Sequence, residues 1–281
     1  MAKKKKEEQT TVIHGFKVFD KGMTCRGFQF EEGREYEESD AVMCEKGFHF
    51  CENPLDVLNY YNVCDSEYAA VEGSGTVVGH TEDSKKSATK LRIVAKLSLA
   101  GFIKASVDFL FQNTRLSEEN TASGDSSQLA ASGYYSQLAA SGDYSQLAAS
   151  GYSSQLAASG DYSQLAASGD SSQLAASGDY SQLAASGYSS KLAASGDSSQ
   201  LAASGDSSQL AMAGSDSVGA AIGINNKIKG VIGDWITLAE WEWDQEKDRY
   251  VPVCVKSAKI DGKKIKPDTW YTLKNGKFVE A

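Results

Sequence analysis

Long apolar runs are missing from this sequence. No stretch approaches the roughly 18 consecutive apolar residues that a helix needs to cross a bilayer, and no apolar segment follows the amino terminus as in a secretory signal. We therefore expect no membrane contact. The five cysteines form an odd set in a chain of 281 residues, which suits reduced thiols better than a disulfide framework. These features predict a cytoplasmic protein.

Positive charge is also scarce, since 28 Lys and Arg stand against 37 Asp and Glu, a net charge of −9. Binding to nucleic-acid phosphates needs clustered Lys and Arg that displace counterions. Direct nucleic-acid binding is therefore disfavoured, and a protein partner is expected. The basic run at residues 3–6 is followed at once by Glu7 and Glu8, and we interpret residues 1–11 as a disordered tail.

Three zones of different composition follow this tail. Residues 12–115 are mixed and rich in aromatic side chains, residues 118–226 are repetitive, and residues 227–281 are dense in Trp, Tyr, Val and Ile. We predict a mainly β protein: an α+β head domain, a β-solenoid over the repeats, and a small β capping domain.

The repeat unit is SQLAASG followed by two variable positions, usually Asp or Tyr and then Ser or Tyr. Leucine recurs every nine residues from Leu129 to Leu210, and glycine keeps the same step from Gly124 to Gly223. Such strict repetition at a short period indicates a stacked array in which each unit buries its apolar face against its neighbours. A helix is the competing interpretation, but a glycine every nine residues would break it repeatedly.

Alternation along each strand predicts which side chains face the core. If Leu129 points inward, Ser127 and Ala131 do too, while Gln128 and Ala130 face solvent. Lys191, which replaces Gln in one repeat, fits an outward position because it is charged. The Ser-Gly segment then forms the corner, and we expect its glycine to supply a positive φ.

The variable position after each glycine suggests how many repeats make one turn. Taken every eighteen residues, it separates into two columns. The first column holds Asp125, Asp143, Asp161, Asp179 and Asp197, and the second holds Tyr134, Tyr152, Asp170, Tyr188 and Asp206. We therefore predict a two-sided coil of eighteen residues, with about five turns rising about 4.8 Å each.

Both ends of such a stack need caps, because unpaired strand edges invite further strands to add. At the carboxyl end, Met212 replaces an inward Ala, Gly219 stands where Leu is expected, and Ile222 replaces Ser. Residues 235–238 and 251–255 then read as strands, and Asp-Gly at 261–262 and Asn-Gly at 275–276 are hairpin signals. We expect the four tryptophans of this zone, at 235, 241, 243 and 270, to be core.

The head zone shows short strands at 15–20, 27–32, 68–71 and 91–99, and a strand that runs into a turn after residue 47. Asn53 is typical of a helix N-cap, with Pro54 at the first helical position.

The chain resembles a family of uncharacterised phage and bacterial proteins. The shared blocks are FKVFDKGMTCRGFQF at 16–30, GFHFCENPLDVLNYY at 47–61, the nonapeptide repeats, and DTWYTLKNGKFVE at 268–280. The family's repeats more usually hold Ala and Thr where this chain has Leu and Ala. The resemblance implies a phage or prophage setting and no established activity.

Two kinds of chemistry are candidates in the head zone. The block from residue 47 faintly resembles the strand-turn-helix element of ADP-ribosyltransferases, which would make His14, Tyr60, Tyr61 and Glu72 pocket residues for a nucleotide ligand. Zinc is the other candidate, because thiolates and imidazole suit it; its ligands would be Cys25, Cys44, His49 and Cys51. Their spacing lacks a C-x-x-C knuckle, and buried structural thiols are favoured. We expect no catalytic function and no cofactor.

The repeats offer a binding surface instead. Tyr144, Tyr162 and Tyr180 share one eighteen-residue column and form a candidate contact stripe, together with the two columns above. The leading hypothesis is a non-enzymatic binding or scaffolding protein with a protein partner, from the host or a second copy of the chain. The alternatives are a DNA mimic or host-defence inhibitor that acts through the acidic solenoid, since the repeats carry seven Asp and one Lys, and calcium binding by the Asp column.

Overall fold

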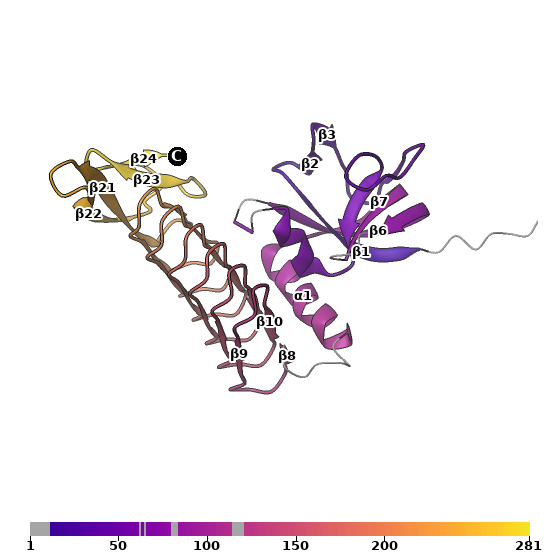
Figure 1. Ribbon diagram of the computed structural model, residues 1–281, viewed down its shortest axis with the longest axis horizontal. Helices are drawn as coiled ribbons and strands as arrows, with labels where there is room; N and C mark the ends of the chain where they lie inside the picture. The colour runs from indigo at the N-terminus through magenta and orange to yellow at the C-terminus, as the bar shows by residue number, and fades with distance from the viewer. Residues whose placement is uncertain (1–11, 62, 65, 80–83, 114–120) are drawn as a thin grey trace, which may run out of the picture. The chain divides into compact units, whose positions relative to one another are not determined.

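The computed structural model describes residues 12–61, 63–64, 66–79, 84–113 and 121–281. The expected tail over residues 1–11, and the first residues of the expected solenoid at 118–120, lie outside them. The chain divides into two compact units (Figure 1): a head of residues 1–61 and 65–98, and a second unit of residues 62–64 and 99–281. Among the described residues, no helix is long and apolar enough to cross a membrane.

The head is built on one antiparallel sheet. Its elements are β1 (Ile13–Phe19), the β2 and β3 pair (Thr24–Cys25 and Phe28–Gln29), β4 (Glu35–Glu37), β5 (Phe48–Cys51), β6 (Glu67–Gly79) and β7 (Lys85–Leu97). The strand order is β4-β7-β5-β1-β6, and β6 also pairs with β7, so the sheet closes on itself. Phe19, Leu91 and Ile93 form its buried centre. Gly15 and Gly73 leave room for the Phe50 ring, since a Cβ at either would lie within 2.5 Å of it.

The expected helix after Asn53 is a short 3-10 helix, η1 (Pro54–Asn59). Asn53 caps it, accepting a hydrogen bond from the Leu55 amide at 3.1 Å, as predicted. Helix α1 (Leu99–Asn113) falls in the second unit. The described head is therefore a β unit with one 3-10 turn. The predicted α+β character rested on the helix expected after Asn53, and that segment forms only this short turn.

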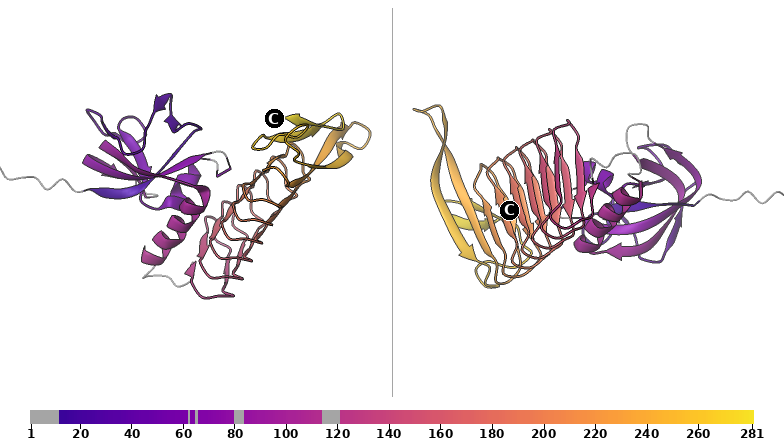
Figure 2. Two further views of the ribbon diagram at one scale, coloured as in Figure 1. Left: turned by 180° about the vertical axis from the view of Figure 1, so that it is seen from behind. Right: turned by 90° about the horizontal axis from the view of Figure 1, so that it is seen from below.

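The second unit is a two-sided β-solenoid, as predicted (Figure 2). One parallel stack, the even sheet, consists of β8 (Thr121–Ala122), β10 (Gln137–Ala140), β12 (Gln155–Ala158), β14 (Gln173–Ala176), β16 (Lys191–Ala194), β18 (Gln209–Met212) and β20 (Lys227–Lys229). The other, the odd sheet, consists of β9 (Gln128–Ala131), β11 (Gln146–Ala149), β13 (Gln164–Ala167), β15 (Gln182–Ala185), β17 (Gln200–Ala203), β19 (Val218–Ala221) and β21 (Trp235–Asp244).

Strands pair in register at a step of eighteen residues, so that Leu147 faces Leu165 and Leu156 faces Leu174. The predicted period and two-sidedness are confirmed. The described residues contain seven strands in each sheet rather than about five turns. The extra coils arise because residues 121–122 and the degenerate segment after residue 209 continue the same pairing.

The core of the solenoid matches the predicted alternation. Leucines from Leu138 to Leu210 are at most 2% exposed. The inward serines are buried as well, and each donates its hydroxyl to a corner glycine carbonyl, for example Ser163 to Gly160 at 2.7 Å. The buried hydroxyl row is thereby hydrogen-bonded within its own coil, which removes the cost of burying it.

The expected role of the corner glycines is wrong. Their φ values are not positive; the left-handed residue stands two positions later, as at Tyr162 (φ 55°) and Ser171 (φ 57°). Glycine is needed because successive corners almost touch. A Cβ on Gly169 would lie 1.7 Å from the carbonyl oxygen of Gly151, one coil below.

The outer faces of the two sheets differ in exposure. Helix α1 packs across β8, β10, β12 and β14, and Cys64 lies on β16 and β18, with its Sγ 3.5 Å from the Leu192 carbonyl oxygen. Gln155 and Gln173 of the even sheet are consequently only 5% and 7% exposed. The prediction that all Gln side chains face solvent is wrong for this sheet and right for the odd sheet.

The carboxyl end caps the stack with antiparallel strands. Trp235–Asp244 of β21 pairs with β22 (Arg249–Lys259), while β20 pairs with β23 (Tyr271–Lys274), which forms the expected Asn-Gly hairpin with β24 (Lys277–Glu280). The Met212 side chain fills the space that Gly219 leaves beside Ile228. Trp235 and Trp243 are about half exposed, so the expectation that the tryptophans are core is wrong for these two, and Trp241 and Trp270 are only partly buried.

Candidate functional site

The tyrosine stripe predicted from the repeats forms a stacked ladder. The rings of Tyr144 and Tyr162, and those of Tyr162 and Tyr180, have centroids 4.9 Å apart and planes within 7° of parallel. All three side chains are 43–55% exposed. Desolvation by its neighbours raises the pKa of Tyr162. The ladder is therefore a continuous aromatic surface that stays open to solvent.

These tyrosines stand at the left-handed corner position, with φ between 55° and 57°. The equivalent corners elsewhere use Ser189, Ser198 and others, so the turn itself does not require an aromatic residue. A left-handed conformation costs an L-residue about 1–2 kcal/mol. Ring stacking offsets part of this cost. An aromatic row at strained, exposed positions is typical of binding surfaces.

The first Asp column has a structural role that the sequence did not reveal. Each carboxylate accepts a hydrogen bond from the backbone amide eighteen residues later, for example Asp161 Oδ1 from the Asp179 amide at 2.8 Å. The same bond links Asp143 to the Asp161 amide at 2.9 Å, and Asp179 to the Asp197 amide at 2.7 Å. The column thus holds one edge of the stack together, and its exposed charges line that edge.

The predicted surface residues divide between two edges. The first Asp column and the tyrosine ladder precede the strands of the odd sheet, while Tyr134, Tyr152 and Tyr188 precede strands of the even sheet. In this second column, Tyr134 and Tyr152 also stack, at 5.0 Å, and Asp170 accepts from the Tyr188 amide at 2.9 Å. The five charges of the first column therefore lie along the corner that leads from each even strand to the next odd strand, beside the Gln row of the odd face.

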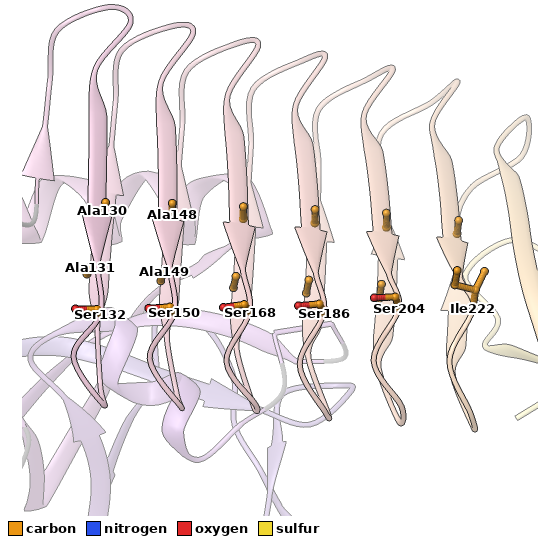
Figure 3. A pocket seen from close by; sticks show the side chains of 17 residues that line it. Ala130, Ala131, Ser132, Ala148, Ala149, Ser150, Ser168, Ser186, Ser204 and Ile222 are labelled. Atoms are coloured by element: carbon orange, nitrogen blue, oxygen red, sulfur yellow. The ribbon is translucent and has the colours of Figure 1, made fainter. Parts of the chain in front are cut away.

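That face, the odd face, consists of the outward side chains of the odd sheet in three rows. The rows are Gln128 to Gln200, Ala130 to Ala202, and Ser132 to Ser204, each repeating every eighteen residues. Two shallow troughs of about 760 and 1230 Å³ run over it, one on the Ala and Ser rows and one on the Gln and Ala rows beside Tyr180. Figure 3 shows the Ser row ending at Ile222.

The odd face becomes apolar at its carboxyl end. Val218 and Trp235 continue the Gln row and are each 47% exposed, while Ile222 continues the Ser row and is 43% exposed. Sequence reasoning treated these residues only as parts of a cap. Continuing the count of eighteen along the Gln row identifies Val218, but Trp235 follows after seventeen residues, and the count misses it.

The head contains a separate cavity of about 600 Å³. Aromatic side chains such as Phe28, Phe30 and Phe48 form much of its wall, and Lys17, Arg26 and Lys85 contribute positive charge. Asp20, Glu37 and Glu38 also line it. Its size falls in the range of small-molecule sites.

Lys17 is buried and His49 is partly buried in the wall of this cavity. Lys17 is 5% exposed and donates to the His49 carbonyl oxygen at 2.9 Å, and burial lowers its pKa. His49 Nε2 accepts from the Cys44 amide at 2.8 Å. Burial, with the nearby charges of Lys17, Lys85 and Arg26, lowers the pKa of His49 to about 4. The imidazole is therefore neutral near pH 7.

The four zinc candidates all line this cavity, but they do not converge. Cys25 Sγ lies 3.4 Å from the Tyr61 hydroxyl, and Cys44 Sγ accepts from Lys85 Nζ at 3.6 Å. His49 Nε2 already accepts the Cys44 amide. Across the described ranges, no group of three or more His, Cys, Asp or Glu side chains could hold a metal ion, and this applies to the Asp column as well as to the thiols.

The four nucleotide-site candidates are also separated. His14 and Glu72 form a cross-strand pair with Nδ1 and Oε1 3.7 Å apart, and Arg92 approaches the same carboxylate at 3.6 Å. Neither His14 nor Glu72 lines the cavity, whereas Tyr60 and Tyr61 do, with Lys85 Nζ 3.9 Å above the Tyr60 ring. The set expected for an ADP-ribosyltransferase-like site is not assembled.

Comparison with known proteins adds one match. A family described as a domain of unknown function (DUF7666) matches residues 13–105. These residues hold the first two sequence blocks quoted above, and the match supports the similarity of this part of the chain to an uncharacterised family. No curated protein and no solved structure matches the chain.

Proposed function

We propose that this chain is a non-enzymatic binding protein that presents the odd face of its solenoid to a protein partner. The observation that carries the proposal is the tyrosine ladder, a stacked aromatic row at corner positions where the fold accepts serine. Aromatic side chains are enriched at protein interfaces because they bury a large area at low entropic cost. A cytoplasmic location and a phage or prophage setting are part of this proposal.

The apolar end of the odd face supports the same function. Val218 pairs with Trp235 across β19 and β21 and both are exposed, while exposed Ile222 follows the other end of β19. Contiguous exposed apolar side chains rimmed by polar rows are typical of protein interaction sites. The Gln and Ser rows supply that polar rim.

A triple substitution of the ladder tests the proposal. Tyr144→Ser, Tyr162→Ser and Tyr180→Ser introduce the residue that other corners hold, so the coil should form. The matched control is Tyr134→Ser, Tyr152→Ser and Tyr188→Ser on the other edge. Quantitative affinity purification from bacterial lysate should lose a partner at least fivefold with the first variant only, with far-ultraviolet circular dichroism unchanged. Equal recovery with all three proteins would contradict the proposal.

The DNA-mimic alternative draws on the same acidic edge. Its five carboxylates are spaced by one coil each, about 4.8 Å, while duplex DNA carries one charge per roughly 1.7 Å. This low density ranks mimicry behind protein binding. Replacing the five Asp with Asn should abolish inhibition of a DNA-binding enzyme if mimicry operates.

Small-molecule binding in the head is a second candidate function, favoured by the 600 Å³ cavity, whose aromatic wall carries three cationic and three acidic side chains. The ligand class would be a small polar molecule with an aromatic or apolar body. Ligand-observed NMR of a polar aromatic fragment set with the full chain should show binding that weakens in Arg26→Ala and Lys85→Met. No fragment bound at millimolar concentration would rule this function out.

A further inference from the structure

The two outer faces of the solenoid carry the same three rows. On the even sheet, Gln155, Ala157 and Ser159 point away from the core, as Gln146, Ala148 and Ser150 do on the odd sheet. The nine-residue repeat produces this equivalence, because each repeat forms one strand and consecutive repeats alternate between the sheets. Whatever packs on one face therefore indicates what the other can accept.

The even face is already occupied by a helix of the same chain. Helix α1 packs across β8, β10, β12 and β14. Ala139, Ala157 and Ala175 of the even face are at most 4% exposed, whereas their counterparts on the odd face are exposed. The Gln-Ala-Ser surface is thus compatible with close helix packing.

The odd face has the length that a helix needs. Its Ala row runs from Ala130 to Ala220 through five steps of one coil, which is about 24 Å. A helix of fifteen residues, the length of α1, is about 22 Å long. Val218, Ile222 and Trp235 supply an apolar end that the even face lacks.

Charge along the corners limits what the odd face accepts. The corner beside its Gln row carries Asp125, Asp143, Asp161, Asp179 and Asp197, and the corner beside its Ser row carries three tyrosines and two aspartates. The helix on the even face carries Lys104 and Asp108, which pair with each other at 3.4 Å. A helix on the odd face would meet a row of carboxylates along one flank, and Lys or Arg there would be favoured.

We propose that the odd face binds an amphipathic α-helix of a partner protein, with an apolar stripe like that of α1 and Lys or Arg along one flank. This inference rests on the proposed function and specifies the part of the partner that is recognised. The helix would lie along the Ala row, between the Gln and Ser rows, with its basic flank over the Asp column and one end on Trp235.

A peptide probe tests the inference. The basic probe is a helix-stapled fifteen-residue peptide with the sequence of residues 99–113 and the changes Asp108→Lys and Gln112→Lys. Together with Lys104, these give three lysines one turn apart. The acidic counterpart is the unchanged sequence of residues 99–113 with Lys104→Glu alone. Fluorescence anisotropy with the full chain should show the basic peptide binding at least tenfold more tightly than the acidic one at low salt.

Variants of the chain localise the site. Ala166→Trp should fill the trough and weaken the basic peptide at least tenfold, and Ala166→Gln, which introduces a side chain already tolerated in the next row, should weaken it less. Ile232→Trp, at an exposed cap position, should leave binding unchanged. Asp143→Asn, Asp161→Asn and Asp179→Asn together should weaken binding severalfold and flatten its salt dependence, because they remove negative charge. The coil should stay intact because Asn keeps the hydrogen-bond acceptor.

The outcomes separate the inference from the proposed function. Equal binding of the peptide to the parent chain and Ala166→Trp, or no binding at all, overturns helix recognition. If the tyrosine variant still loses its partner in that case, the odd face binds a partner of another shape. A dimer in light scattering that Ala166→Trp dissociates would show that a second copy occupies the face, and this too overturns the inference.

Discussion

Substitution of one corner glycine tests the packing of the coils most directly. In Gly169→Ala, the new Cβ would lie 1.7 Å from the Gly151 carbonyl oxygen. Real Cβ contacts are not found under 3.0 Å, so the two coils must part by about 1.3 Å, the difference between the two distances. The variant therefore acts on the spacing between coils rather than on the conformation of its own turn.

The magnitude follows from the hydrogen bonds on either side of this corner. Ser168 donates its amide to the Ala149 carbonyl at 3.1 Å, and Gln173 donates to the Ser154 carbonyl at 2.8 Å. Parting by 1.3 Å takes both beyond hydrogen-bonding distance. Each buried group left without its partner costs about 1–3 kcal/mol, so we expect a loss of about 2–6 kcal/mol.

Gly133→Ala is the matched control, because the same SQLAASG segment ends at this glycine in the first coil. Its Cβ would meet nothing closer than Ser136 Oγ at 3.5 Å, and the change should stay within about 1 kcal/mol of the parent chain. Urea denaturation followed by circular dichroism at the β-sheet minimum measures both variants. Equal destabilisation of the two, or less than 1 kcal/mol for Gly169→Ala, would refute the stacking explanation.

Three further predictions concern single side chains. Asp161→Asn should leave hydrogen exchange of the Asp179 amide slow, because its Oδ1 still accepts, whereas Asp161→Ala should accelerate it; equal rates would show that the bond is dispensable. His49 has a folded pKa of about 4, below its unfolded value. Between pH 6.5 and 4 the unfolded state therefore binds more protons than the folded state, and the contribution of His49 to stability is lost as the pH falls through this window. The parent chain should therefore lose roughly 1–2 kcal/mol more than His49→Gln between pH 7 and 4.5 in urea titrations, after allowance for solvent screening, and parallel curves would contradict this. Met212→Ala should destabilise the carboxyl end by about 2–4 kcal/mol, because it empties the space beside Gly219; a melting temperature unchanged within 1 °C would show that the end collapses to fill it.

The solenoid was predictable because its signals are strictly local and periodic. The inward Leu row, the outward Gln row of the odd sheet, and the two corner columns all follow from a period of two within a strand and eighteen between coils. Met212 in place of Ala and Gly219 in place of Leu also indicated the cap. In each case the sequence carries the same information that the backbone uses.

Other features depend on contacts that the repeat cannot encode. The sequence QLAA is identical on both sheets, so nothing in it distinguishes the face that α1 covers from the one that stays open. An invariant glycine is compatible with a positive φ and with a close approach, and only the position of the coil below decides between them. The charge column was read as a surface feature because its amide partners lie eighteen residues away.

The head was less predictable for a similar reason. His14 and Glu72 were grouped with Tyr60 and Tyr61 by analogy with a motif, but strand alternation places the pair away from the cavity. The cavity itself forms where β1, β5, η1 and the β2–β3 segment meet. Its buried Lys17 could be suspected only once the closed sheet was known.

Because strands pair at a step of eighteen residues, the solenoid can change its length only by whole coils. Inserting or deleting one eighteen-residue segment within the repeats adds or removes one strand of the odd sheet, so each row of the odd face changes by one residue, and every other neighbour relation stays intact. A nine-residue change would instead transfer each later strand to the opposite wall, mix tyrosine with aspartate along both corners, and present β21 and β23 to the wrong partners. Copy number in whole coils is therefore a way to tune the reach of the surface while both ends of the protein are conserved.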